Sequence, residues 1–153
     1  MAKRRGKTQH IEFKVNEILA KDGVDIVNVD NTRMHILTSL DKLKRRFPNG
    51  KSWAHRVINT ANSAFFNSAT LISQNKGQGC RRHKHPDCDE FWVILSGRMR
   101  VEAGEGAGTE RIEVSAGDIV YLKKGTGHRL TVISDNPGVR LSVSVEAMRN
   151  TYF

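Results

Sequence analysis

The sequence predicts an all-β fold, an antiparallel sandwich or barrel over residues 51–153, with an α/β extension over residues 1–50 in front of it. From about residue 51, short segments rich in Thr, Val, Ile and aromatic residues alternate with turns, and helix signals are scarce. The 153 residues are the usual length of one domain. We therefore expect one barrel, with the extension packed on it or swapped around it.

The extension contains signals for two helices and two strands. Residues 12–21 suit a short helix that ends at Asp22-Gly23, and residues 25–29 and 34–38 suit short strands. Residues 39–47 suit an amphipathic helix in which Ser39 is the N-cap and Pro48-Asn49-Gly50 ends the helix. The apolar positions Leu40, Leu43 and Phe47 share one face of this helix.

The barrel region divides into eight β segments separated by turns. Residues 103–110 form a glycine-rich hairpin loop, and Asn136-Pro137-Gly138 is another turn. Many short strands at this spacing are typical of a sandwich or a barrel. The segments are residues 52–58, 64–73, 91–96, 98–102, 111–116, 118–123, 128–134 and 139–147.

The charge of the chain is uneven and lies mostly outside the barrel. Residues 1–56 hold 13 Lys/Arg and 6 Asp/Glu, whereas the rest of the chain holds 12 and 10. We interpret the basic start as a solubilising tail rather than a nucleic-acid contact, because no helix-turn-helix or basic-aromatic pattern accompanies it. The chain shows neither a secretory signal nor an apolar run of membrane-spanning length, so we expect a cytoplasmic protein.

A cluster of metal-ligand side chains lies between residues 83 and 90. His83 and His85 point to the same side of a strand, and a turn then leads to Glu90 at the start of the next strand, which can lie antiparallel to the first. Imidazole and carboxylate ligands suit Fe, Mn, Ni, Co, Cu or Zn. His128 follows a strand and a glycine turn, and two hairpins of a small barrel can bring it to the same interior.

These residues closely resemble the two sequence motifs of the cupin family. The first motif, G-x5-H-x-H-x3,4-E-x6-G, matches at every specified position from Gly77 to Gly97. The second motif, G-x5-P-x-G-x2-H-x3-N, begins at Gly117 and includes Gly125 and His128. It departs from the family pattern at two positions, where Lys123 replaces the proline and Val132 replaces the asparagine.

The resemblance covers residues 52–147 and implies an antiparallel jelly-roll barrel. It also implies that His83, His85, Glu90 and His128 bind one divalent transition metal ion, whose identity stays open among Fe, Mn, Ni, Co, Cu and Zn. Cupins commonly pair through strand edges and swapped N-terminal segments, so the resemblance further implies a homodimer.

Residues near the expected metal site extend the prediction. Strand alternation places Arg81 on the same side as His83, where it is either a contact for an anionic ligand or part of a salt bridge at the rim. Tyr121 is a candidate acid or hydrogen-bond donor, although packing is the favoured role. Cys88 is best explained as a small buried side chain. Four further positions are expected to line the interior, mainly as core: Trp92, Ile94, Leu130 and Val132.

Three functions stay open, and we rank them in order. The first is an oxygen-dependent, dioxygenase-like oxidoreductase that acts on a small anionic or chelating substrate, with Glu90, Arg81 and Tyr121 as candidate catalytic residues. The second is a non-redox isomerase or lyase that acts on a sugar acid. The third is a non-catalytic ligand-binding or regulatory cupin. A metal site with open coordination positions favours catalysis, but the fold alone does not decide the reaction.

Overall fold

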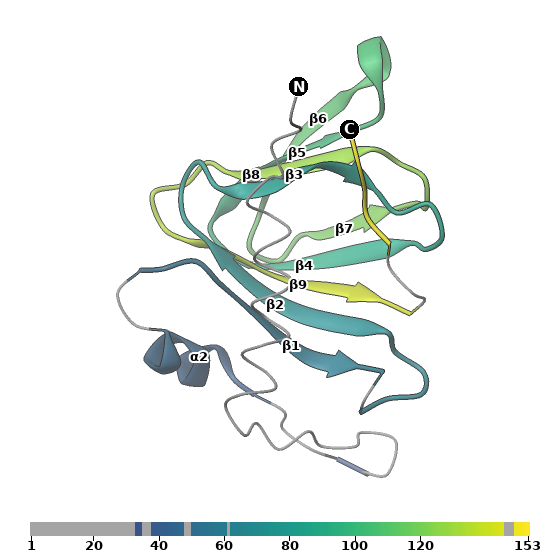
Figure 1. Cartoon of the computed structure of the whole chain (residues 1–153). Helices are drawn as coiled ribbons and strands as arrows, with labels where there is room; N and C mark the ends of the chain where they lie inside the picture. The colour runs from purple at the N-terminus through teal and green to yellow at the C-terminus, as the bar shows by residue number, and fades with distance from the viewer. Residues whose placement is uncertain (1–32, 35–37, 48–49, 61, 146–148) are drawn as a thin grey trace, which may run out of the picture.

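The computed structural model describes residues 33–34, 38–47, 50–60, 62–145 and 149–153. Two five-stranded antiparallel sheets lie face to face, in the strand orders β1-β2-β9-β4-β7 and β10-β3-β8-β5-β6 (Figure 1). The strands are β1 (Trp53–Asn59), β2 (Ser68–Gln74), β3 (Gly79–Lys84), β4 (Glu90–Ser96), β5 (Arg98–Ala103), β6 (Glu110–Ser115), β7 (Ile119–Leu122), β8 (His128–Val132), β9 (Gly138–Ser144) and β10 (Thr151–Tyr152). The predicted all-β jelly-roll architecture is confirmed.

Strands β3 and β4 lie in different sheets, which corrects one expectation. Strand β4 pairs with β7 and β9, whereas β3 pairs with β8 and β10, so Glu90 does not lie on a strand hydrogen-bonded to that of His83. The two residues instead face each other across the barrel. The prediction that His128 comes close to His83 is confirmed, because these two residues are direct partners in the β3–β8 ladder.

An apolar core fills the space between β4, β7 and the strands β5, β6 and β8 opposite them. Met99 and Leu130 have no exposed surface, and Ile94 and Val132 are each 1% exposed. The four expected lining residues are all buried, which confirms their role as core. The cluster comprises Trp92, Ile94, Met99, Val101, Val114, Val120, Leu122, Leu130 and Val132.

The helix predicted over residues 39–47 is present as α2 (Leu40–Arg46). The Ser39 hydroxyl accepts a hydrogen bond from the backbone N–H of Lys42 at 3.2 Å, as expected of an N-cap. Leu43 is buried, and the Phe47 ring stacks on Trp53 of β1 at 5.7 Å. The elements predicted over residues 12–21 and 25–29 lie outside the described residues, and those at 34–38 lie mostly outside them.

The start of β2 and the presence of β10 differ from the prediction for local reasons. The segment expected from residue 64 begins at Ser68, because the Ser63 hydroxyl accepts hydrogen bonds from the N–H groups of Phe65 and Phe66 and holds them in a turn. The short strand β10 was not predicted, since two residues carry no alternation pattern. In the part of the chain that the structure describes, no helix has the length and hydropathy needed to cross a membrane.

Candidate metal centre

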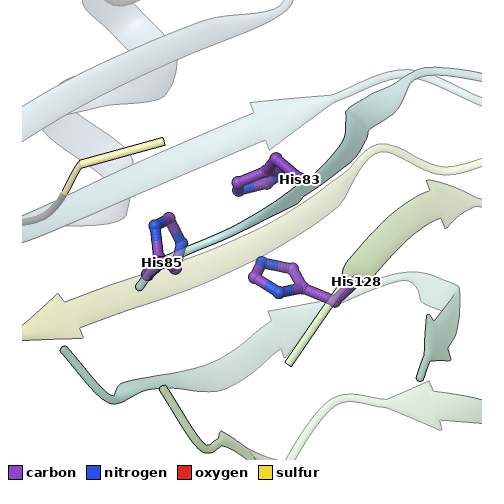
Figure 2. Close-up of side chains that lie close together, drawn as sticks. All are labelled: His83, His85 and His128. Atoms are coloured by element: carbon purple, nitrogen blue, oxygen red, sulfur yellow. The ribbon is translucent and has the colours of Figure 1, made fainter. Parts of the chain in front are cut away.

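Three histidines converge inside the barrel from the two motifs. His83 lies near the end of β3, His85 follows that strand, and His128 begins β8. One ring nitrogen of each lies within 4.8 Å of those of the other two, and all three side chains are buried. Figure 2 shows the three imidazoles turned toward one another. The predicted meeting of these residues is therefore confirmed.

Backbone carbonyl groups fix the orientation of each imidazole. The Nδ1 atoms of His83 and His128 lie 2.6 and 2.9 Å from the carbonyl oxygens of Arg81 and Thr126. His85 Nδ1 lies 3.2 Å from the carbonyl oxygen of Arg149. A carbonyl only accepts, so each Nδ1 donates its proton outward and leaves the Nε2 lone pair for the interior. This arrangement is typical of histidines that bind a metal through Nε2.

Glu90 adds a buried carboxylate to the cluster. Its Oε2 atom lies 3.1 Å from Nε2 of His85 and 3.7 Å from Nε2 of His128. Burial on its own raises the pKa of this carboxyl, but hydrogen bonds with His85 and the Ser142 hydroxyl outweigh burial and lower the pKa to about 2. Glu90 therefore carries its negative charge throughout the physiological range.

The chemistry of these four side chains fits a bound cation. Burial, together with the nearby His83, lowers the pKa of His128 to about 4, so this imidazole is neutral and able to ligate. Among the described residues, the buried Nε2 atom of His128 has no hydrogen-bond partner. Between His85 Nε2 and Glu90 Oε2, 3.1 Å apart, one of two cations is needed: either a second proton on His85, which makes the hydrogen bond that lowers the Glu90 pKa, or a metal ion in place of that proton. Three histidines and one glutamate can hold one divalent transition metal ion.

Arg81 does not follow the expected alternation. Two residues of β3 lie opposite one residue of β8 between Cys80 and His83, which is a β-bulge. Arg81 is exposed as a result, and its guanidinium lies 5.6 Å from the centre of the Tyr152 ring. The expectation that Arg81 lines the interior beside the histidines is therefore wrong.

Tyr121 lies on the outer face of the barrel. It pairs with the exposed Phe91 across β4 and β7, whereas Glu90 pairs with the buried Leu122. The Tyr121 hydroxyl donates to Asp89 at 2.7 Å, and its side chain is 63% exposed. Tyr121 therefore faces away from the histidine cluster in this structure, and its candidate role as an acid there stays a prediction. Cys88 is buried, as predicted for a small side chain.

Segment 149–153 lies across the edge of the cluster and was not anticipated. Strand β10 pairs with β3 so that Tyr152 lies opposite His83, and the two rings are 5.6 Å apart. The carbonyl of Arg149 receives the His85 hydrogen bond described above. The Arg149 guanidinium makes two hydrogen bonds to the carboxylate of Asp87, at 2.5 and 2.7 Å. This segment therefore supports two of the three histidines.

The interior cation is Arg140 rather than Arg81. Arg140 lies on β9, is 4% exposed, and places its guanidinium 5.3 Å from the centre of the Trp92 ring. The Trp92 ring in turn lies 5.6 Å from the His128 ring. In the sequence, Arg140 follows a turn and a single valine, and no motif surrounds it. Only the alternation of inward and outward residues along β9 could have predicted that Arg140 is buried.

Comparisons with known proteins place this site in a family. Residues 70–144 match the family described as the cupin domain, and they include all three histidines and Glu90. This part of the chain therefore forms a cupin domain, as the motifs predicted. No match was found among curated proteins.

Similar solved structures include oxalate decarboxylases. One, from Bacillus subtilis and described with Mn(II) centres, is 23% identical and has a TM-score of 0.58, over 70% of this chain and 29% of that chain. Another, from Lactobacillus farciminis in a formate complex, is 22% identical, with a TM-score of 0.58 over 70% of this chain and 32% of that one. The present chain thus spans about a third of their length, and the likeness establishes the fold.

Proposed function

We propose that the protein is a metal-dependent cupin enzyme that binds one divalent transition metal ion through His83, His85, His128 and Glu90. The observation that carries the proposal is the convergence of three buried imidazoles, each oriented by a backbone carbonyl, beside an ionised carboxylate. A metal bound there supplies Lewis-acid chemistry and, if it is Fe or Mn, one-electron redox chemistry.

The reaction we favour is an oxygen-dependent, dioxygenase-like oxidation of a small anionic or chelating substrate. Four protein ligands leave coordination positions for small molecules, which is typical of catalytic rather than structural metal sites. The apolar core around Trp92 and Leu130 keeps water away from one side of the cluster. Among the protein groups, the Glu90 carboxylate would offset the positive charge of the metal ion, and the backbone carbonyls would hold the imidazoles in place.

A non-redox lyase that acts on a small acid is the second candidate. The buried Arg140 favours it, because a guanidinium inside the barrel suits a carboxylate substrate. Several proteins that share this fold are oxalate decarboxylases. The two candidates differ in whether turnover requires dioxygen.

One experiment separates these candidates. Protein loaded in turn with Fe(II), Mn(II) or Zn(II) is incubated with a panel of small carboxylic acids, with and without dioxygen, and products and oxygen uptake are followed. The favoured reaction predicts oxygen uptake that needs Fe or Mn and is lost in His128→Ala. Turnover that persists without dioxygen, or with zinc, contradicts it and favours the lyase. Acid binding without any product favours the non-catalytic alternative.

We also propose a homodimer in the cytoplasm, as the sequence led us to expect. Light scattering on the purified full chain tests the dimer, and a monodisperse monomer contradicts it. Localisation of a tagged full-length protein tests the compartment.

A further inference from the structure

Arg140 is a buried cation with few compensating contacts. Its Nη1 atom donates to the side-chain oxygen of Gln74 at 2.7 Å, and its Nε atom has no hydrogen-bond partner among the described residues. Within that part of the chain, no carboxylate forms an ion pair with it, and burial lowers its pKa. A guanidinium has five donors, and burying one with a single neutral amide as its hydrogen-bond partner is costly, although the Trp92 ring beneath it offsets part of the cost.

Several buried polar side chains lie near Arg140, although its direct cross-strand partners, Ile72 and Ile94, are apolar. Thr70 and Ser142 lie opposite each other on β2 and β9, and Ser142 donates to Glu90. Arg56, on β1, donates to the Thr70 hydroxyl at 3.4 Å. These hydroxyl groups connect the surroundings of Arg140 to the metal-ligand cluster. We call Gln74, Thr70, Arg140 and Ser142 the polar wall.

The charge inside the barrel is unbalanced once a metal is bound. A divalent ion and the Arg140 guanidinium together outweigh the single carboxylate of Glu90. A low-dielectric interior with excess positive charge favours the entry of an anion. Neutral hydroxyl and amide groups such as those of Thr70 and Gln74 can complete its hydrogen bonds.

We propose that Arg140 binds the anionic end of a small carboxylic acid whose other end binds at the histidine cluster. This inference rests on the proposed metal site and identifies the group that recognises the substrate. Arg140 lies two residues along β9 from Ser142, which corresponds to roughly 7 Å along a strand. The centre of the Trp92 ring also lies 5.3 Å from the Arg140 guanidinium and 5.6 Å from the centre of the His128 ring, so an acid that reaches both ends has to pass an indole ring. We therefore assign an elongated acid, with its metal-binding oxygen and its recognised carboxylate separated by a carbon chain.

Calorimetry on zinc-loaded protein tests the assignment without any turnover. The probes are succinate and glutarate, with their neutral diamides as controls and oxalate as a compact acid. The variants are Arg140→Met, which removes the charge, and Arg140→Lys, which keeps the charge but loses the planar fork. Arg100→Met is the matched control, because Arg100 pairs with Glu113 and is half exposed. Zinc content and the melting temperature are measured on every sample.

The inference predicts that wild type binds succinate or glutarate more tightly than oxalate or the diamides. Arg140→Met should weaken dicarboxylate binding by about tenfold or more, Arg140→Lys by less, and Arg100→Met should leave it unchanged. Equal affinity in wild type and Arg140→Met, or in Arg140→Lys if the first variant does not fold, overturns the assignment. A zinc-loaded wild type that binds no dicarboxylate at millimolar concentration also overturns it, whereas a wild type that binds no zinc contradicts the proposed function.

Discussion

The interior of this barrel has two buried regions of opposite character. The core around Leu130, Met99 and Val101 is apolar, whereas the polar wall around Arg140 on β2 and β9 consists of hydroxyl, amide and guanidinium groups. Apolar burial stabilises the fold, while buried polar groups with incomplete partners reduce stability and are retained at functional sites. The histidine cluster lies at the border, because His128 contacts both Trp92 and Glu90.

The largest expected effect on stability comes from the apolar region. Leu130→Ala removes a side chain with no exposed surface, so the free energy of unfolding should fall by about 2–5 kcal/mol. Ile112→Ala, at a half-exposed position, should change it by less than about 0.5 kcal/mol. Urea denaturation of the metal-free proteins measures both. Similar losses for the two variants would contradict the description of this region as the stabilising core.

Acid should destabilise the metal-free protein through the border residue His128. Its pKa is about 4 in the folded chain and about 6.5 in an unfolded one. Between these values the unfolded chain binds a proton that the folded chain does not, so stability rises with pH across this window and is complete above it. The free energy of unfolding of the metal-free protein should therefore be about 3 kcal/mol higher above this window than below it. His128→Gln should remove this pH dependence.

Denaturation at several pH values measures this dependence. Glu90 acts in the same direction at lower pH, because its folded pKa of about 2 lies below the ordinary value of 4.5. The slope between pH 4 and 6.5 is therefore compared between wild type and His128→Gln. Identical slopes would show that His128 is not held neutral by burial.

Removal of segment 149–153 should weaken metal binding more than it weakens the fold. The deletion takes away the carbonyl that orients His85 and the Tyr152 ring beside His83. Loss of such outer partners typically costs about 10–100-fold in metal affinity. Zinc competition titrations measure it, with Tyr152→Ser as a smaller change in the same segment. Unchanged zinc affinity in the deletion variant would refute the supporting role.

The smallest expected effect belongs to the polar wall. Ser142→Ala removes the hydroxyl that donates to Glu90, so the carboxylate loses one of the bonds that favour its charged form. The free energy of unfolding should fall by about 1 kcal/mol, and the pKa of Glu90 should rise. Ser115→Ala, at an exposed hydroxyl, is the control. Nuclear magnetic resonance titration of Glu90 reports the pKa, and a lower value in Ser142→Ala would contradict this contact.

The comparison also explains how far the sequence could predict the molecule. The apolar strands and the histidine motifs were predictable, because alternation in segments such as residues 128–134 and fixed spacing between ligands leave a clear pattern. Arg81 was predicted to face inward because alternation assumes a regular strand, and the bulge in β3 shifts it.

The polar wall could not be recognised from the sequence in the same way. Ser and Thr on β2 and β9 resemble residues of a solvent-exposed face, and only strand alternation in β9 distinguishes the buried Arg140 from an exposed arginine. The contribution of segment 149–153 depends on pairing between residues nearly 70 positions apart, Tyr152 and His83. Such long-range pairing is set by the whole barrel rather than by any local motif.

The most direct test of the central claim is the metal content of the full chain purified without an affinity tag or chelator. Elemental analysis compares wild type with His128→Ala and with His55→Ala, a buried histidine outside the cluster. The account predicts about one equivalent of Fe, Mn, Ni, Co, Cu or Zn in wild type and in His55→Ala, and its loss in His128→Ala. Full occupancy in His128→Ala, or no metal in wild type even after reconstitution, would contradict it.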